Sequence, residues 1–390
     1  MFCRGVSFTS WRNIPSANIE FDEGINVLWG MNAQGKSNIL EGAYYFARGR
    51  SFRGAKDKEL IRFGDSFASL SLLCRRNGFE EDTALDIVIP KSGKKLLKRN
   101  SAPLSSPSEM IGIFRAVLFC PRDLGIIGGG PLERRTFLDV ALSQLSGTYL
   151  AYLRRYARLL AERNALLKKA ADGYKPTSGE WEVYAEAMGE CAAVIAAYRA
   201  EYVKLLDGEI KRYFAGMTAG AETPSLEYVS HAACEGLPSP LRDGLTSTAG
   251  AEVLAEKLLA NTEREAAVGS TLWGVHKDDI TVKLNGTDAR AYASQGQERS
   301  LALSFKIGEA EIAGRYGGEY PVILLDDVFS ELDESRRAYI LSSLAEGSGG
   351  ECGGARRQII ITSCEPDVIP GKSDARFIKV QNGEVLTPKG

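Results

Sequence analysis

Alternating hydrophobic and polar positions dominate the first 130 residues and predict β-strands there. Two runs, INVLWG at 25–30 and RAVLFC at 115–120, are short and almost wholly apolar, which is typical of strands buried within a sheet. Apolar residues switch to helical spacing from Asn38 to Phe46. The other strand-like stretches are 2–8, 17–21, 67–74 and 84–89, and the first two are expected to form a hairpin.

Helical spacing takes over from Glu133 to about Phe214. We expect two long helices here, interrupted by the Gly- and Pro-containing stretch 173–179. The following stretch, 216–250, is rich in Gly, Pro, Ser and Thr and is expected to form loops. The pattern therefore predicts a mostly helical insertion in the chain.

Strand-like alternation returns after residue 270. Asn285-Gly286 is a strong hairpin signal between strands expected at 279–283 and 289–293. Helices at 296–314 and 334–345 should alternate with strands at 321–327 and 357–363, the last of the chain. This order predicts an α/β fold, a mixed sheet with flanking helices. The expected domains are 1–130 and 271–390, two halves of one head, and 131–270, an inserted helical lobe.

The overall charge changes this picture little. Lys and Arg number 48 and Asp and Glu 50, giving a net charge of −2, so any nucleic-acid contact needs a local basic patch. No stretch approaches the roughly 18 apolar residues of a membrane span, and the first residues lack a secretory h-region. Seven cysteines without a C-x-x-C pair, and two histidines, argue against a zinc site and favour free thiols in the cytoplasm.

The strongest chemical signal is the string GMNAQGKS, which fits the Walker A pattern G-x-x-x-x-G-K-[ST] completely. Backbone N–H groups of such a loop cradle phosphates at a helix N-terminus. We expect Lys36 to reach the β- and γ-phosphates of a nucleotide and the Ser37 hydroxyl to bind Mg²⁺. The loop comprises Gly30, Met31, Asn32, Ala33, Gln34, Gly35, Lys36 and Ser37.

A second motif, VILLDD at 322–327, is an apolar strand that ends in two carboxylates. The carboxyl end of a buried parallel strand faces the ligand crevice of an α/β sheet. Asp326 is expected to hold Mg²⁺ through water, the Walker B role, and Asp327 to polarise the attacking water.

A third motif comprises Ser294, Gln295, Gly296 and Gln297 and opens the helix before that strand. By itself it also fits an ordinary N-capped helix. The order of Walker A, this motif, the acidic strand and then Ser330-Glu-Leu-Asp333 resembles the ABC-type ATPases. In that family the signature serine contacts ATP bound to a second subunit. The resemblance therefore implies ATP and Mg²⁺ as ligands, an ATP-dependent homodimer with Ser294–Gln297 acting in trans, and a D-loop containing Ser330 and Asp333.

Further strings narrow the resemblance to the RecF family of bacterial DNA replication and repair proteins. They are Ser51–Arg53, Phe119–Leu124, Pro131–Asp139 and Trp273–Asp279. Val275 and Lys277 depart from the Pro and Arg usual in that family, and a lysine loses the bidentate fork of an arginine. Asp327, and Thr362 in place of a switch histidine, depart from transporter ATPases and suggest slow hydrolysis.

The RecF resemblance implies an ATP-dependent protein that clamps single- and double-stranded DNA at gapped junctions and helps RecA to load with RecO and RecR. The alternative is the nucleotide-binding subunit of a membrane transporter, which lacks support because Thr362 replaces the switch histidine. A chromosome-structuring head is disfavoured because no long heptad array occurs.

DNA binding requires basic surface, and three clusters could supply it. The candidate contacts are Lys94, Lys95, Lys98 and Arg99. The other clusters are 48–58 and the arginines and lysines of 154–169, which include Arg163. A solvated face is the alternative for each. Tyr149, Tyr152 and Tyr156 could stack on bases, but their helical spacing favours core or interface packing. Such lysines and arginines contact the DNA backbone without reading sequence.

Overall fold

The computed structural model describes residues 1–232, 240–243, 248–329, 334–346, 357–365 and 375–386. Ser330 and Asp333 lie outside these residues. The chain divides into two compact units, one formed by Met1–Asp123 with Leu303–Gly390 and the other by Leu124–Ala302.

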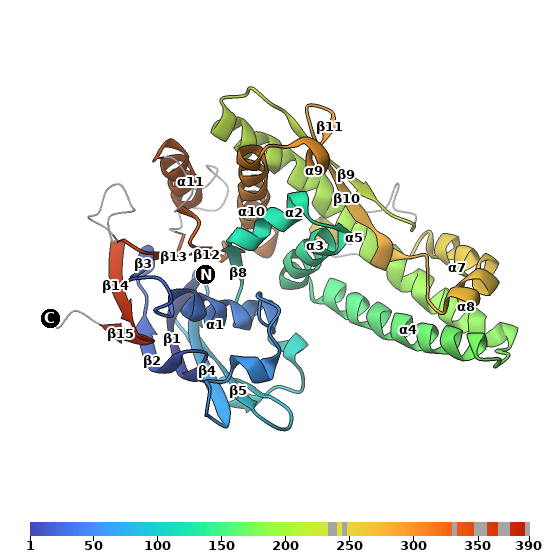
Figure 1. Cartoon of the computed structure of the whole chain (residues 1–390), viewed down its shortest axis with the longest axis horizontal. Coiled ribbons are helices and arrows are strands. Elements are labelled where there is room, and N and C mark those ends of the chain that lie inside the picture. The colour runs from blue at the N-terminus through green and yellow to red at the C-terminus, as the bar shows by residue number, and fades with distance from the viewer. Residues whose placement is uncertain (233–239, 244–247, 330–333, 347–356, 366–374, 387–390) are drawn as a thin grey trace. The chain divides into compact units, whose positions relative to one another are not determined.

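Two sheets build the first unit (Figure 1). One is antiparallel, in the order β2-β1-β4-β5-β6-β7, and the other has the order β15-β14-β3-β13-β12-β8. The helix α1 contacts β1 and β4 of the first sheet and β8, β12 and β13 of the second, so it packs between them. The strands are β1 (Phe2–Trp11), β2 (Ile14–Glu20), β3 (Ile25–Trp29), β4 (Phe67–Arg75), β5 (Asp82–Pro90), β6 (Leu96–Arg99), β7 (Ala102–Pro103), β8 (Ala116–Phe119), β12 (Val322–Asp326), β13 (Ile359–Ser363), β14 (Ala375–Gln381) and β15 (Glu384–Leu386).

The central strands of the second sheet explain its position in the core. All residues of β8, β12 and β13 are buried, because these parallel strands are covered on both faces and their sequences are apolar to match. The strands β3, β13, β12 and β8 run parallel, so their carboxyl ends share one edge. The helix α1 (Lys36–Arg48) follows β3, and α11 (Glu334–Glu346) lies between β12 and β13 in the chain.

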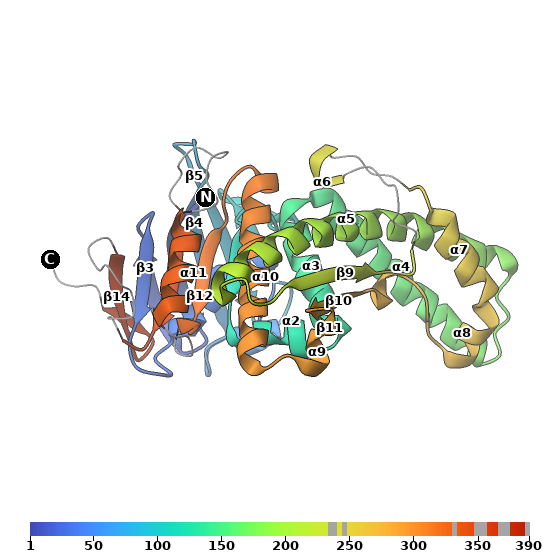
Figure 2. The ribbon, with the colours of Figure 1, turned by 90° about the horizontal axis from the view of Figure 1, so that it is seen from above.

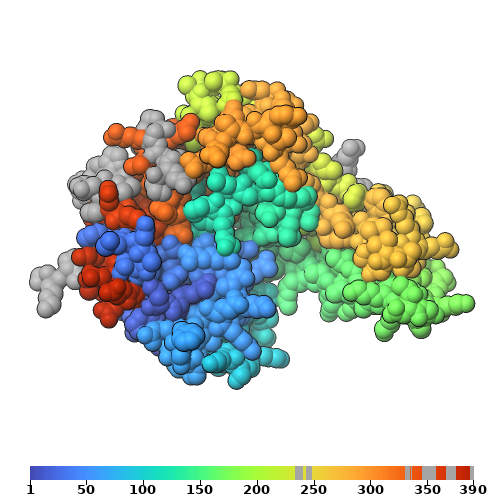
Figure 3. Space-filling view, viewed as in Figure 1, coloured from blue at the N-terminus to red at the C-terminus, as the bar shows by residue number. Residues whose placement is uncertain are grey.

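Long helices and a small sheet form the second unit. The helix α5 contacts α4, α7 and β9, and Figure 2 shows β9 running along α5. In the space-filling view, α7 and α8 lie together with α4 at one end of this unit (Figure 3). Its helices are α2 (Gly125–Gly128), α3 (Pro131–Leu145), α4 (Gly147–Ala171), α5 (Ser178–Thr218), α6 (Pro240–Asp243), α7 (Ala251–Ala260), α8 (Thr262–Val268) and α9 (Ala289–Tyr292). Its strands are β9 (Pro224–Val229), β10 (Asp279–Leu284) and β11 (Thr287–Asp288).

The helix α10 (Gln295–Gly317) begins in the second unit and ends in the first. Within the residues that the structure describes, no helix combines the length and apolar character that crossing a bilayer requires.

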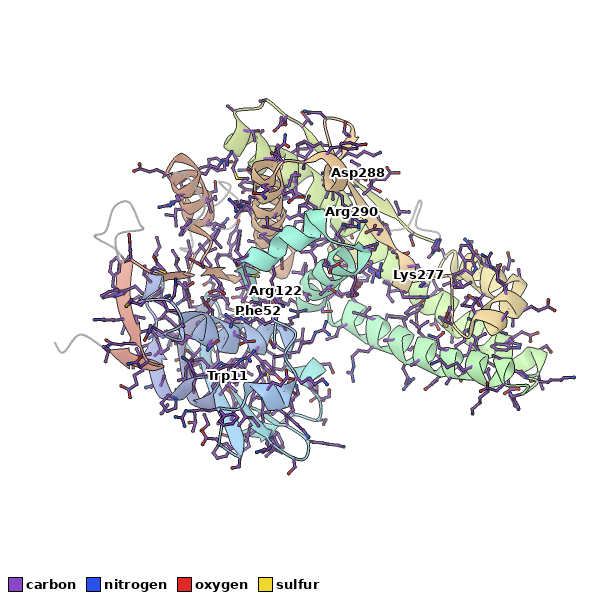
Figure 4. The ribbon with its side chains drawn as sticks, viewed as in Figure 1. Trp11, Phe52, Arg122, Lys277, Asp288 and Arg290 are labelled. Atoms are coloured by element: carbon purple, nitrogen blue, oxygen red, sulfur yellow. The ribbon has the colours of Figure 1, made fainter. Side chains whose placement is uncertain are left out.

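Four local predictions were wrong. The first of the two long helices expected between 133 and 214 is divided into α3 and α4, because the Ser146 hydroxyl accepts the Tyr149 N–H at 3.1 Å and caps a new helix. Residues 224–229, expected as loop, form β9 because β10 supplies an antiparallel partner, with Ile280 opposite Tyr228. Residues 289–292 form a helical turn because the Asp288 carboxylate accepts the Arg290 N–H at 2.9 Å and caps it (Figure 4). The strand at 359–363 is followed by two more, β14 and β15.

Candidate nucleotide site

The Walker A loop joins β3 to α1 in a conformation that only its glycines permit. Gly30 has φ 153°, and a Cβ there would lie 2.2 Å from the Val380 carbonyl oxygen. Gly35 has φ 111° and caps the N-terminus of α1. The Lys36 ammonium donates to the Gly30 carbonyl at 2.5 Å and to the Met31 carbonyl at 2.8 Å. The Lys36 ammonium therefore connects the start of the loop to the N-terminus of α1, a position that favours the binding of anions.

A pocket of about 370 Å³ opens at this loop. The residues that line it belong to the first unit and lie far apart in the sequence. Residues 32–38 form one wall. Asp327 and Thr362 reach it from the ends of β12 and β13, because parallel strands present their carboxyl ends at the same edge. Asn13, Arg53 and Cys364 complete the lining, and no sequence motif had indicated Asn13 or Cys364.

The Walker B pair is held by one hydroxyl. Thr362 Oγ1 donates to Asp326 Oδ1 at 3.0 Å and accepts the backbone N–H of Asp327 at 2.9 Å. Asp326 is 5% exposed, whereas Asp327 is exposed. Asp327 has φ 54°, a left-handed conformation that costs a non-glycine residue about 1 kcal/mol or more. The chain thus turns sharply between a buried carboxylate and one that lines the pocket.

Arg53 lies beside both Walker motifs. Its Nη1 donates to Asn38 Oδ1 at 3.0 Å, and its Nη2 lies 3.7 Å from Asp326 Oδ2. Its guanidinium also lies over the Phe52 ring, with 5.4 Å to the ring centroid. The Arg122 guanidinium donates to the Arg53 carbonyl at 2.8 Å, and Figure 4 labels Phe52 and Arg122. Arg53, noted in the sequence within a family string and a basic cluster, is therefore part of the pocket wall.

Buried pairs anchor this wall to α1. Glu41, fully buried, accepts two hydrogen bonds of 2.9 Å from the Arg12 guanidinium and one from the Ser51 hydroxyl. The Trp11 indole (Figure 4) donates to the Asn38 carbonyl at 2.8 Å. These bonds fix Arg53 and Asn13 relative to the Walker A helix, since β1 and the loop after α1 are tied to the same helix.

The signature motif begins α10 in the second unit. Ser294 and Gln297 form a reciprocal capping box: the Gln297 N–H donates to Ser294 Oγ at 3.3 Å, and the Ser294 N–H donates to Gln297 Oε1 at 2.7 Å. Ser294 and Gln295 are exposed. A Cβ on Gly296 would meet no atom within 4 Å, so packing within the chain does not require a glycine there.

Two other segments that resemble the RecF family, Pro131–Asp139 and Trp273–Asp279, stabilise the second unit through ion pairs. Arg134 of α3 forms two hydrogen bonds, of 2.6 and 2.9 Å, with the Asp279 carboxylate. Arg199, 2% exposed, donates to the Val275 carbonyl at 2.7 Å and to Asp278 at 3.1 Å. Lys277 is exposed at this segment (Figure 4). The segment at 274–279 is thus tied to α3 and α5 by buried ion pairs.

The predicted DNA contacts differ from one another in the structure. Lys94, Lys98 and Arg99 are exposed. The Lys95 ammonium instead donates to the Tyr45 hydroxyl at 2.8 Å and lies 3.1 Å from the Asp57 carboxylate. In the helical insertion, Arg163 is 1% exposed and pairs with Glu265 at 2.7 Å, so it belongs to the core. Tyr149 and Tyr156 are buried, as their spacing predicted, whereas Tyr152 is half-buried.

No family model matches the sequence. The DNA replication and repair protein RecF of Clostridium tetani is 36% identical over 388 residues, which cover 99% of this chain and 100% of that protein. RecF of Staphylococcus aureus (strain Newman) is 36% identical over 385 residues, 98% of each chain. A solved structure of the recombination mediator protein RecF with ATP, in the RecFOR pathway, is 32% identical with a TM-score of 0.87 and covers 99% of this chain and 97% of that one.

The fold is also that of an Smc head domain derived from Pyrococcus furiosus, with a TM-score of 0.56 at 15% identity, covering 99% of this chain and 96% of that one. The two-sheet fold and the Walker A pocket thus define a P-loop head of the ABC and SMC type, which confirms the predicted fold class. Identity over nearly the whole length then shows the family. The chain belongs to the RecF family of DNA replication and repair proteins, as the sequence motifs predicted, and the transporter alternative falls away.

Proposed function

We propose that this chain is an ATP-dependent DNA-binding protein of recombinational repair and replication restart, which closes as a dimer on DNA when it binds ATP. The observation that carries the proposal is the pocket that Walker A residues line together with Arg53 and Asp327. The relative described as RecF-ATP supports ATP as the nucleotide. At the start of α10, Ser294 and Gln295 are exposed and the space around Gly296 is open, which supports a role for Ser294–Gln297 toward a nucleotide bound by a second copy.

The residues of the pocket fit ATP with Mg²⁺. Lys36 has only loop carbonyls as partners among the described residues, and a phosphate oxygen is a stronger acceptor for an ammonium than a carbonyl. Ser37 and Asp326 offer a hydroxyl and a carboxylate, the oxygen ligands that Mg²⁺ prefers. The ion would neutralise charge on the phosphates. Ser37 would hold it directly, and Asp326, fixed by Thr362, would hold it through water.

Asp327 is the candidate general base for hydrolysis. Asp327 lines the pocket and is exposed, and its carboxylate would accept a proton from a water molecule beside the γ-phosphate. Arg53 would add positive charge on the same wall. No imidazole reaches the pocket from the described residues, because Thr362 occupies the end of β13. We therefore propose slow hydrolysis that resets the dimer rather than rapid turnover.

The DNA-related steps rest on family membership. The RecF structure described within the RecFOR pathway supports RecO and RecR as partners, and we propose that the chain acts with them in the cytoplasm. We propose that the ATP-bound dimer binds DNA near junctions of single and double strands and helps RecA to load there. Exposed lysines such as Lys94 and Lys98 would contact phosphates without reading base sequence.

Sedimentation of the full-length chain tests this proposal. The samples contain ATP, ADP or no nucleotide, each with and without gapped DNA, and Lys36→Ala serves as the control. We expect a monomer-to-dimer shift with ATP alone, larger with DNA and absent in Lys36→Ala. Identical sedimentation in all conditions would contradict the ATP-driven dimer.

A further inference from the structure

Large apolar side chains are exposed at both nucleotide motifs. Among the described residues, the three most exposed are Phe63, Met31 and Tyr292, at 101%, 78% and 76%. Met31 is the second residue of the Walker A loop, and Tyr292 precedes the signature serine by two residues. Each motif thus exposes one large apolar side chain, and burial of that side chain against a partner would recover free energy that contact with water forfeits.

Hydrogen bonds hold the backbone that presents each side chain. The Met31 carbonyl accepts the Lys36 ammonium at 2.8 Å. Tyr292 ends α9, whose start Asp288 caps and whose last turn is closed by a 3.0 Å bond from the Ala293 N–H to the Ala289 carbonyl (Figure 4). These hydrogen bonds fix the backbone positions from which the Met31 and Tyr292 side chains extend into solvent.

A second exposed apolar side chain, Leu132, belongs to the same unit as Tyr292. The helix α9 contacts α2, and α2 contacts α3, where Leu132 is 65% exposed. Beside them, the start of α10 presents Ser294 and Gln295 to solvent, and Gly296 leaves open space above the helix. A second molecule can therefore approach the signature face closely.

We propose that Met31 of one copy and Tyr292 of a second copy pack against each other in the ATP-bound dimer, so that Tyr292 covers the edge of the nucleotide pocket of the other chain. This inference rests on the proposed function, since only a head-to-tail dimer brings the signature of one chain to the Walker A loop of the other. Two-fold symmetry makes the contact twice.

The chemistry of the two side chains suits this contact. A thioether packs favourably against an aromatic ring, and the tyrosine hydroxyl can stay hydrated at the rim. A second copy is the favoured occupant because the two side chains occur on the two motifs that must meet. DNA is less suited to Met31, which has no charge for phosphate and no ring for stacking.

A double-mutant cycle on ATP-dependent dimerisation tests the contact. Met31→Ser, Tyr292→Ser and the double variant are compared with the parent by sedimentation equilibrium in ATP. Phe63→Ser is the matched control, because Phe63 is the most exposed of the three and lies outside both motifs. ATP binding by monomeric Tyr292→Ser is measured by calorimetry.

We expect each single variant to weaken dimerisation about tenfold, equivalent to about 1.4 kcal/mol. The double variant should lose less than the product of the two single losses, because each substitution removes the same contact. Phe63→Ser should dimerise like the parent, and Tyr292→Ser monomers should bind ATP normally.

If the parent dimerises in ATP and both single variants dimerise equally well, this inference is overturned and the proposed function stands. If the loss of dimer affinity in the double variant equals the product of the two single losses, the two residues do not contact each other directly. A parent that stays monomeric in ATP overturns both proposals.

Discussion

Thr362 connects two strands through a single hydroxyl, which contacts both Walker B residues. It donates to the buried Asp326 carboxylate and accepts the backbone N–H of Asp327, a residue with a left-handed backbone conformation. The resemblance to ABC-type ATPases implies a switch histidine of transporters at the end of this strand, where the sequence has Thr362. We infer that it orients the carboxylates instead of contacting the γ-phosphate.

Replacing this hydroxyl tests that role. Thr362→Val keeps the shape of the side chain but leaves a buried carboxylate and an N–H without their partner, which should lower the free energy of unfolding by about 1–3 kcal/mol. ATP hydrolysis should also slow, because Asp327 is no longer held. Denaturant titration and a phosphate-release assay measure the two effects. Thr362→Ser, which retains the hydroxyl, should restore most of both; equal defects in the two variants would contradict the orienting role.

Asp327→Asn separates binding from hydrolysis. The amide cannot accept a proton from water, so turnover should fall by about 100-fold or more while ATP still binds. ATP-bound dimers should consequently persist longer, which sedimentation after ATP addition can follow. Normal turnover in Asp327→Asn, together with loss of turnover in Asp326→Asn, would reverse the roles assigned to the two carboxylates.

The strand β6 and the loop before it present lysines of two kinds. Lys94 and Lys98 are exposed, whereas Lys95 turns inward to Asp57 and lies over the Tyr45 ring, 5.1 Å from its centroid. One basic cluster in the sequence thus combines solvent-facing charges with a charge that joins β6 to α1.

This difference makes a prediction for DNA binding. Lys94→Ala with Lys98→Ala should weaken DNA binding and reduce the slope of log K against log salt by about 1 for each lysine that contacts a phosphate. The melting temperature should change little. Binding is measured by fluorescence anisotropy at several salt concentrations, on more than one DNA sequence.

Lys95→Ala is the matched comparison. It should lower the free energy of unfolding by roughly 1–2 kcal/mol through loss of its ion pair and ring contact, and leave the salt slope unchanged. An unaltered salt slope in the double variant would exclude this strand as a DNA-contacting surface.

The nucleotide motifs are divided between the two units of the molecule. Walker A and Walker B belong to the first unit, and the Ser294 motif belongs to the second. The chain passes between the units twice, at Asp123–Leu124 and within α10.

A mixture of two inactive chains tests action in trans. Ser294→Arg should bind ATP as a monomer, because Lys36 and Ser37 are intact, but its guanidinium should block closure. Lys36→Ala should lack ATP binding. A heterodimer of the two retains one composite site, with Lys36 from the first chain and Ser294 from the second. Mixing should therefore restore part of the ATPase activity, measured against each variant alone.

The outcome depends on one site being sufficient for turnover. Parent-like activity of Ser294→Arg alone would remove the case for a trans site. A Ser294→Ala control shows whether loss of the hydroxyl or the bulk of the arginine is responsible.

The Walker A loop, the alternating strands of the first unit and the long helices of the second could all be predicted from local pattern. The reason is that glycine conformations, strand alternation and helical spacing are properties of neighbouring residues. The order of motifs indicated an ABC-type ATPase, and further strings such as Pro131–Asp139 and Trp273–Asp279 narrowed the resemblance to the RecF family. Short elements such as β9 were missed because a distant strand, β10, pairs with them and overrides a loop-like composition.

Only the tertiary structure decided which charged side chains act in the site and which hold the fold. Arg53 reaches Asp326, and Thr362 reaches Asp327, because parallel strands and α1 bring together residues that lie far apart in the chain. Arg163 and Lys95 had the appearance of surface charges in the sequence, but in the structure they form ion pairs with Glu265 and Asp57 that stabilise the fold. A charged residue has the same letter in either role, and only its neighbours in space determine whether its charge faces water, a ligand or another buried charge.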